Sequence, residues 1–279
     1  MSEPEAIVGS GAGSGTEQSL AADLHALGVG EGMVVLVHSS LSALGWVCGG
    51  PVAVIRALRD ALGANGTLVM PAHSGDLSDP SLWRSPPAPS AWWDTIRATM
   101  PAFDPAVTRT SHLGVIPELF RTWPGTVRSD HPSCSFAALG PHAGRIVAEQ
   151  RLEDPMGEGS PLSAIYELDG HVLLLGVGRK VGHRNNTMLH LAERRALGDG
   201  QETIPAGAPI LVDGVREWVS YREPDIDEDD FDEAGAAFER QDTTTRTGLV
   251  GQARCTLLRV RPLVDFAMPW LKRHRNATD

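Results

Sequence analysis

Short apolar runs between glycine- and proline-containing turns predict the strands of a buried sheet. The run at 33–38, Met-Val-Val-Leu-Val-His, is bounded by turn residues and is typical of a parallel-sheet strand covered on both faces. Comparable runs predict strands at 66–71, 172–177 and 255–260. Two shorter segments, 209–212 and 216–221, predict a hairpin.

Apolar residues at helical spacing predict helices between these strands. A helix over 17–27 places three leucines on one face and ends at Gly28. Further helices are predicted at 51–62, 92–98, 116–121, 187–197, 231–240 and 262–273. Because strand, helix and strand alternate, the pattern favours an α/β fold with right-handed crossovers.

Composition fits one large domain behind a short tail. The chain has 279 residues, of which 42% are hydrophobic, enough for a sizeable core. Residues 1–15 are rich in glycine and serine and predict a disordered tail, which leaves 16–279 as a single domain. No apolar run has the length of a membrane span and the start does not resemble a signal peptide, so we expect a cytoplasmic protein that does not bind membranes.

The three cysteines are far apart and form no CxxC pair. A disulfide framework or structural zinc site is therefore not expected, and buried free thiols are. No HExxH motif is present, which disfavours a zinc hydrolase, and we expect no metal.

Acidic residues are concentrated in one segment. The net charge is −11, which makes nucleic acid a poor partner, and eight acids between positions 223 and 233 leave −3 for the rest. The spacing of these acids fails as an EF-hand because Asp230 occupies the position that needs glycine. Two interpretations stay open: a solvated loop, or an electrostatic sink for a substrate with several ammonium groups.

The segment after the first strand leads through a glycine- and serine-rich loop into a helix. Backbone amides at such a helix start, with glycines that allow close approach, could hold the pyrophosphate of a coenzyme. An ordinary strand–helix connection explains the same pattern, which is neither a P-loop nor GxGxxG. The candidate residues are His38, Ser39, Ser40, Leu41, Gly45, Gly49 and Gly50.

The string 186–193, Asn-Thr-Met-Leu-His-Leu-Ala-Glu, places a histidine in the first turn of a predicted helix. His190 and Glu193 are three residues apart and therefore share a face. A helix N-terminus favours the neutral imidazole that a general base requires, and the carboxylate can orient the ring. The alternative is a surface His–Glu pair. An acyl nucleophile at Ser39 or Ser40 would lack a GxSxG elbow.

At these residues the chain resembles the aminoglycoside 3-N-acetyltransferases. The resemblance runs from about residue 17 to the C-terminus. It rests on segments that occur in the same order: 37–41 with 49–51, 92–97, 101–105, 120–125, 131–140, 157–162 and 186–193.

The resemblance implies a three-layer α/β/α fold with a central mixed, largely parallel sheet, unlike the common small acetyltransferase fold. It implies acetyl-CoA as donor and, as acceptor, the 3-amino group of the deoxystreptamine ring of an aminoglycoside, which would confer resistance. His190 resembles the family's base and Glu193 its orienting partner. The coenzyme site would extend from Ser39 and Ser40 to Thr110, Ser111 and Phe120. The acids expected to bind the acceptor are Asp76, Asp94, Glu158, Glu223 and Asp225.

Other functions stay open from the sequence. An acetyltransferase of the same fold could act on a different amine in biosynthesis, and a non-catalytic protein could bind a cationic ligand. The basic loop at 179–184 would either contact the coenzyme's phosphates or repel a cationic acceptor. The chain could be a monomer or a homodimer.

Overall fold

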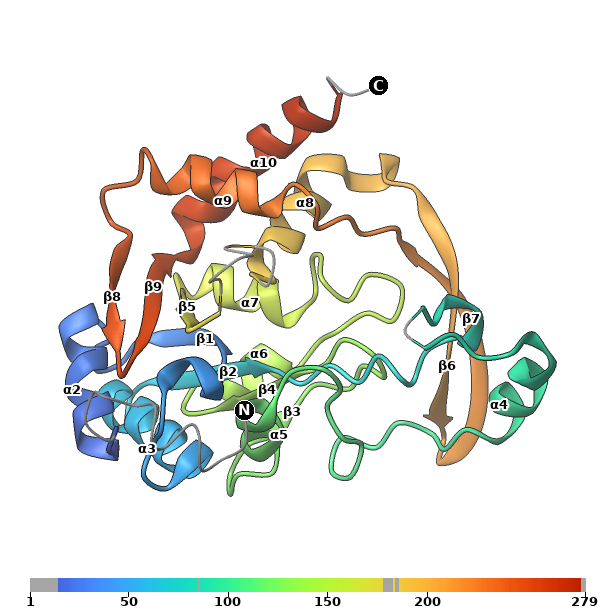
Figure 1. The fold of residues 1–279 in the computed structure, drawn as a ribbon. Coiled ribbons are helices and arrows are strands. Elements are labelled where there is room, and N and C mark those ends of the chain that lie inside the picture. The colour runs from blue at the N-terminus through green and yellow to red at the C-terminus, as the bar shows by residue number, and fades with distance from the viewer. Residues whose placement is uncertain (1–14, 85, 178–182, 184–185, 277–279) are drawn as a thin grey trace.

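A seven-stranded mixed sheet forms the centre of the molecule (Figure 1). The computed structural model describes residues 15–84, 86–177, 183 and 186–276. The strand order is β3-β4-β2-β1-β5-β9-β8. The strands are β1 (Val34–Ser39), β2 (Thr67–Pro71), β3 (Val127–Arg128), β4 (Phe136–Leu139), β5 (His171–Leu175), β8 (Arg246–Val250) and β9 (Ala253–Arg259).

Helices cover both faces of the sheet, which confirms the predicted three layers. Val35 and Val37 of β1 belong to one apolar core, with α2 (Glu17–Leu27), α3 (Gly50–Leu62) and α5 (Val115–Arg121). Val34 and Leu36 alternate with them and belong to the second core. The helices of that second core are α6 (Ala143–Val147), α7 (Pro161–Glu167), α8 (Met188–Leu197), α9 (Phe231–Glu239) and α10 (Val260–Asn276).

The sheet is less parallel than predicted. Only the pairings of β1 with β2 and with β5 are parallel, whereas the other four are antiparallel. The difference has two sources: β9 falls at a predicted strand but runs antiparallel to β5, and β3, β4 and β8 are strands that the apolar pattern does not reveal. β4 is only four residues long, and β8 is largely exposed, so neither forms a recognisable apolar run.

A long hairpin extends beyond the sheet. Residues 97–103 contact it. The strands β6 (Thr203–Val212) and β7 (Val215–Pro224) pair along their full length, which confirms the hairpin but makes it longer than predicted. The turn residues Asp213 and Gly214 both have positive φ, as a type I′ turn requires. The helix α4 (Trp93–Thr99) lies beside the hairpin (Figure 1).

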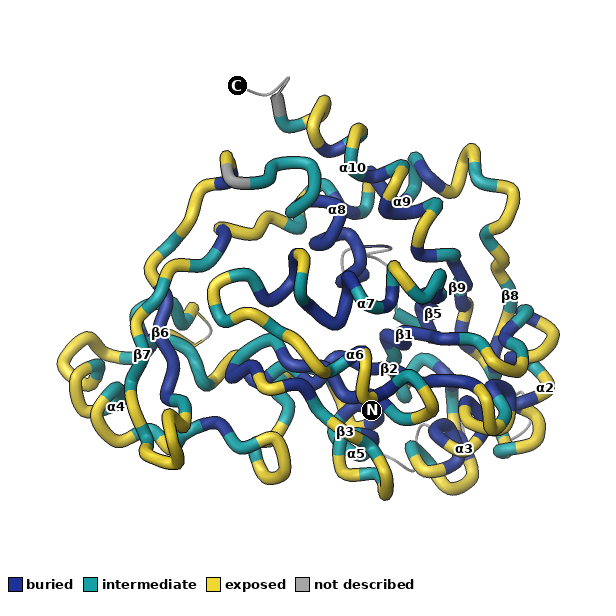
Figure 2. Tube along the Cα trace, turned by 180° about the vertical axis from the view of Figure 1, so that it is seen from behind, coloured by how far each residue is buried: buried dark blue, intermediate teal, exposed yellow. Residues whose placement is uncertain are grey.

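The hairpin and α4 form an arm that is less buried than the sheet, although residues 206–209 of β6 are buried. Figure 2 shows buried residues gathered in the sheet and the helices on it, whereas α4 has no buried residue. The arm is held by hydrogen bonds to main-chain carbonyls: the Phe103 N–H donates to the Pro209 carbonyl at 3.0 Å, and the Arg216 side chain donates through Nε to the Met100 carbonyl at 3.0 Å. The short 3₁₀ helices are η1 (Leu41–Leu44), η2 (Pro80–Leu82), η3 (Ser90–Trp92) and η4 (Gly198–Gly200).

Two further expectations are tested by the structure. All three cysteines are free thiols, but Cys48 is exposed and only Cys255 is buried, so the prediction of buried thiols holds for one of them. Of the predicted tail, only Gly15 lies in the described part of the chain, where it bridges Val47. Within the described residues, no helix combines the length and apolarity needed to span a membrane.

Candidate active site

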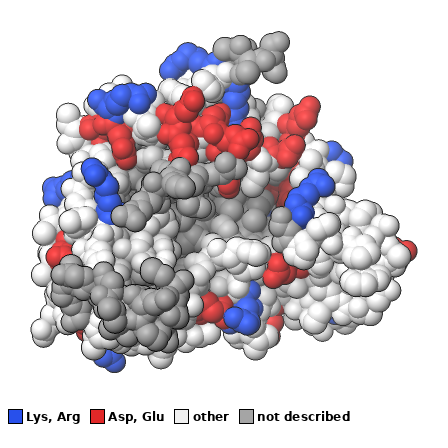
Figure 3. Space-filling model, in the orientation of Figure 1, with Lys and Arg blue, Asp and Glu red and all other residues white. Residues whose placement is uncertain are grey.

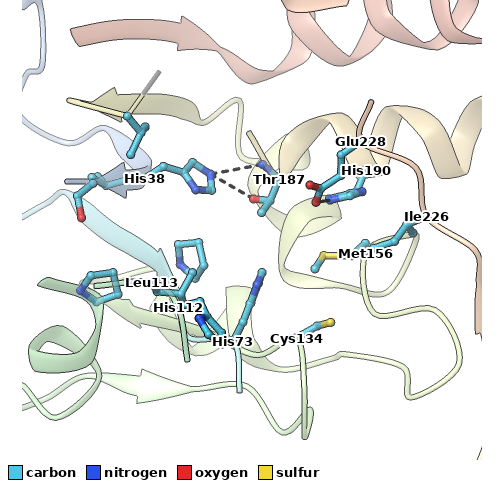
Figure 4. Close-up of a pocket in the computed structure, with 15 residues that line it drawn as sticks. His38, His73, His112, Leu113, Cys134, Met156, Thr187, His190, Ile226 and Glu228 are labelled. Atoms are coloured by element: carbon cyan, nitrogen blue, oxygen red, sulfur yellow. Dashed lines mark hydrogen bonds and ion pairs between the residues drawn. The ribbon is translucent and has the colours of Figure 1, made fainter. Parts of the chain in front are cut away.

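A cavity of about 360 Å³ lies at the carboxyl ends of the parallel strands β1 and β2 and beside the start of α8. This edge is where open α/β sheets commonly bind ligands, because the loops there diverge. Figure 4 shows that the side chains around it come from segments far apart in sequence. Its polar lining includes His38, Ser39, His73, His112, Cys134, Thr187, His190 and Glu228.

His190 lies between two carboxylates at the wall of this cavity. Its Nδ1 is 3.4 Å from Glu193 Oε2, and its Nε2 is 3.2 Å from Glu228 Oε1. The ring contacts Phe231 edge-on and is only 3% exposed. Burial lowers the pKa of His190, but the hydrogen bonds from Glu193 and Glu228 outweigh it, and the net shift is upward.

This upward shift corrects one expectation. The helix start alone favours neutral imidazole, and His190 does lie in the first turn of α8. Two carboxylates in direct contact act more strongly than the partial charge of a helix end. The His190–Glu193 pair is also buried rather than on the surface, because Glu193 has no exposed area.

The start of α8 is fixed by residues from β1 and from the preceding loop. His38 Nε2 accepts from the Thr187 N–H at 3.4 Å and lies 3.3 Å from Thr187 Oγ1 (Figure 4). The Asn186 side-chain oxygen accepts from the Met188 N–H at 3.2 Å, as a capping residue does. Burial, with repulsion from His190, lowers the pKa of His38 to about 3, so His38 stays neutral and accepts through Nε2.

A second cavity of about 550 Å³ adjoins the first. It is lined by four of the residues predicted to bind a coenzyme, and it shares Ser39, His112 and Leu113 with the first cavity. Those four residues are Ser39, Ser40, Leu41 and Gly45. Within the described residues, Ser39 Oγ is buried without a hydrogen-bond partner. An unpaired polar atom between two cavities is a reason to expect a polar ligand there.

The other predicted coenzyme residues lie elsewhere. Gly49 and Gly50 are at the start of α3, and the described lining of neither cavity includes them. Thr110 Oγ1 donates to Glu118 at 2.8 Å. The Ser111 N–H donates to the His73 carbonyl, which places it next to the first cavity. Phe120 has no exposed area and belongs to the core, and the described lining of neither cavity includes it.

The predicted acceptor-binding acids are not brought together. Glu223 is half-buried near Cys134, and burial raises its pKa. Asp225 and Asp76 are exposed. Asp94 lies on α4 beside the outer hairpin, 3.5 Å from Arg97, and Glu158 pairs with Arg195 at 2.6 Å.

The acidic run does reach the cavity, through a residue that the sequence pattern does not distinguish. Glu228 lines it and contacts His190, although it lies 38 residues farther along the chain. Figure 3 shows acidic side chains gathered along the edge of the central hollow. The basic loop at 179–184 lies outside the described residues except for His183, whose Nε2 is 3.0 Å from Glu239 Oε1.

Comparisons with known proteins identify the family of this chain. The family profile described as aminoglycoside 3-N-acetyltransferase matches residues 36–272. The SPbeta prophage-derived aminoglycoside N(3')-acetyltransferase-like protein YokD of Bacillus subtilis is 47% identical over 91% of this chain and 92% of its own length. Its crystal structure matches with a TM-score of 0.93 at 44% identity, over 98% of each chain.

Further relatives carry more specific names. Aminoglycoside N(3)-acetyltransferase VII of Streptomyces paromomycinus is 39% identical over 92% of this chain and 91% of its own. A solved structure of AAC-IIIb, described as a binary complex with CoASH, has a TM-score of 0.82 and 32% identity over 94% of this chain and 98% of that one. Sisomicin-bound AAC-VIa has a TM-score of 0.83 and 29% identity over 94% and 99%. The chain therefore belongs to the aminoglycoside 3-N-acetyltransferase family and is an acetyltransferase.

Proposed function

We propose that the chain transfers the acetyl group of acetyl-CoA to the 3-amino group of the deoxystreptamine ring of aminoglycosides, with His190 as general base. The observation that carries this proposal is the position of His190, between Glu193 and Glu228 at the wall of a cavity that opens into a second one. The relatives named for CoASH and for sisomicin support the donor and the acceptor class.

Each carboxylate would have a separate role. Glu193, fully buried, holds Nδ1–H and keeps the ring oriented, as the acid of a catalytic triad does. That leaves Nε2, on the Glu228 side, to accept a proton from the acceptor. Glu228 would attract the acceptor's ammonium group, because it is a partly exposed carboxylate on the cavity wall.

The acceptor reacts as the neutral amine, after its ammonium form has lost one proton to the solvent, and the reaction then moves one further proton twice. Acetyl-CoA supplies the acetyl group as a thioester. As the acceptor nitrogen forms its bond to the carbonyl carbon and the carbon–sulfur bond breaks, His190 Nε2 takes the proton that the amine loses. The same proton then passes to the leaving sulfur. Ser39 is the candidate donor to the charge that develops on the carbonyl oxygen, because its hydroxyl is buried without a partner in the described chain.

The geometry favours this reaction over a serine hydrolase. Ser40 Oγ contacts another hydroxyl, that of Ser42, at 3.2 Å. Within the described residues, Ser39 Oγ has no hydrogen-bond partner at all, so no base is placed to activate it. A covalent acyl-enzyme is therefore not expected.

Identification of the product tests the proposal. The enzyme would be incubated with acetyl-CoA and, in turn, gentamicin, kanamycin, apramycin and the non-aminoglycoside polyamine spermine. Mass spectrometry would detect acetylated product, and NMR would locate the acetylated nitrogen. A 3-N-acetylated aminoglycoside is the expected result. Acetylation of spermine alone would indicate a different amine substrate, and no product with any acceptor would contradict the proposal.

A further inference from the structure

Arg275, in the last turn of α10, connects the two carboxylates that face His190. Its Nη1 donates to Glu193 Oε1, the carboxylate oxygen that does not contact His190. Glu193 has no exposed area, and Arg275 is the cation beside it. A buried carboxylate needs such a partner, since an unpaired charge in the interior is strongly unfavourable.

The same guanidinium also holds the segment that carries Glu228. Nε and Nη2 of Arg275 donate to the two carboxylate oxygens of Asp230, each at 2.8 Å. Nη2 also donates to the Asp227 carbonyl at 2.7 Å. Planar, two-pronged pairing of this kind fixes direction as well as distance. Glu228 lies between these two anchored residues.

A third contact closes the network. The Asp227 N–H donates to Glu193 Oε1 at 3.3 Å, the same oxygen that Arg275 contacts. Glu193 is therefore tied to α10 and to the 227–230 segment at once. The hydrogen bonds with Asp230 and Glu193 raise the pKa of Arg275, so it remains charged.

We infer that Arg275 is a positioning residue for acetyl transfer: it holds Glu193 directly and Glu228 through Asp227 and Asp230, so that both carboxylates meet the His190 ring. The inference rests on the proposed function. It adds a role for α10, a helix that contributes no described residue to the lining of the cavity beside His190.

The consequence of removing Arg275 follows from the groups around His190. These groups are Glu193 of α8, Glu228 and Asp230 before α9, His38 of β1 and His73 after β2. Without Arg275, Glu193 and the 227–230 segment lose the contact that holds them against the ring. Because the contacts with Glu193 and Glu228 raise the pKa of His190, their loosening lowers that pKa. Loss of the Arg275 charge alone, with both carboxylates still in place, would instead raise it.

The test compares Arg275→Met, Arg275→Lys and the exposed neighbour Arg273→Met on the same helix. In Arg275→Met we expect kcat at neutral pH to fall by about 10- to 100-fold, as for misplacement of a catalytic group. The acid limb of the pH profile should move to lower pH, with an unchanged KM for acetyl-CoA. Arg275→Lys keeps the charge but not the fork, so it should lower kcat and move the acid limb in the same direction but less far. Arg273→Met should behave as wild type.

Two outcomes would overturn the inference. The first is an Arg275→Met enzyme with a lower melting temperature but wild-type kcat and pH limb, which is what a purely structural contact predicts. The second outcome applies if Arg275→Met does not fold: it is a wild-type kcat in the folded Arg275→Lys enzyme.

Failure of the proposed function can be told apart from failure of this inference. A wild-type enzyme that acetylates no aminoglycoside contradicts the proposed function. NMR titration of the His190 ring tests Arg275 without any turnover. We expect a lower His190 pKa in Arg275→Met than in wild type, and an unchanged or higher pKa would contradict the positioning role.

Discussion

The pH behaviour of the site is set by two carboxylates on one imidazole. Burial lowers the pKa of His190, whereas the contacts with Glu193 and Glu228 raise it above the ordinary 6.5. A general base must be neutral to accept a proton. The rate should therefore fall as the pH drops through a His190 pKa that lies above 6.5.

Replacing Glu228 by Gln tests which partner raises that pKa. The amide carries no negative charge, so the pKa of His190 should fall and the acid limb of kcat should move to lower pH. The measurement is the kcat of acetyl transfer between about pH 5 and 9, at saturating donor and acceptor. Glu158→Gln, at a surface pair with Arg195, is the control and should leave the limb in place. An unmoved limb in Glu228→Gln would contradict the role of this contact.

Single residues are predictable from sequence only where their spacing is local. His190 and Glu193 are three residues apart on one helix, and this spacing identifies them as a pair. Glu228 is 38 residues from His190, and Arg275 is 82 residues from Glu193. No local pattern relates such positions, because tertiary packing alone brings them together.

At the scale of elements, α9 packs against His183, a described residue just before α8. His183 lies against Gly235 of α9 so closely that an added Cβ would be 2.0 Å from the His183 ring carbon Cγ. The same ring contacts Glu239 on the next turn at 3.0 Å. The Asn186 N–H donates to the His183 carbonyl at 2.8 Å, which connects this contact to the start of α8.

A methyl group at Gly235 should therefore disturb the site from a distance. In Gly235→Ala, His183 must move, and we expect a loss of stability of about 1–3 kcal/mol, typical of overpacking, together with a lower kcat. Thermal unfolding and acetyl-transfer kinetics would measure both. Gly144→Ala on α6 is the matched control, because a Cβ there meets open space and the substitution should be neutral or slightly stabilising. If Gly235→Ala and Gly144→Ala had the same stability and the same kcat, this account of Gly235 would be wrong.

Elements were predictable where their apolar pattern is long. The central strands β1, β2, β5 and β9 and the helix α8 fall close to their predicted positions. The hairpin is longer than predicted because Pro205 and Gly207, residues that weaken a strand pattern, lie inside β6. β4 is missed because four residues provide too little pattern.

At the scale of the whole molecule, the acidic segment 223–233 both forms structural ion pairs and places negative charge at the cavity. Glu228 faces the cavity, and Asp230 is paired with Arg275. Asp225 remains exposed at the end of the hairpin, near this edge of the cavity. Exposed acids at a cavity edge concentrate cations, and salt weakens the effect because the screening length is about 10 Å at 0.1 M.

Replacing Asp225 by Asn should raise the KM for an aminoglycoside at low salt. The increase should shrink as salt is added, whereas kcat should change little, since Asp225 does not contact His190. The control is Asp60→Asn, an exposed acid on α3 at the other face of the sheet, which should leave KM unchanged at any salt concentration. A KM increase in Asp225→Asn that does not depend on salt would argue against an electrostatic role.

The layer architecture was predictable from sequence, but the strand directions were not. Alternating apolar runs and helices imply a covered sheet, and the structure has one. The edge strands β3 and β8, and β4 next to β3, are short or exposed, so their direction depends on packing that no local pattern records. The strands at the centre of the sheet are therefore easier to predict from sequence than the strands at its edges.

The most direct test of the central claim is thiol release from acetyl-CoA, with gentamicin present and absent, by wild type and His190→Ala. Acetyl-CoA binding would be measured in parallel. Wild type should release thiol only with the aminoglycoside. His190→Ala should bind acetyl-CoA normally but turn over about 10²–10⁴-fold more slowly, the usual contribution of a general base. Unchanged turnover in His190→Ala would contradict the account.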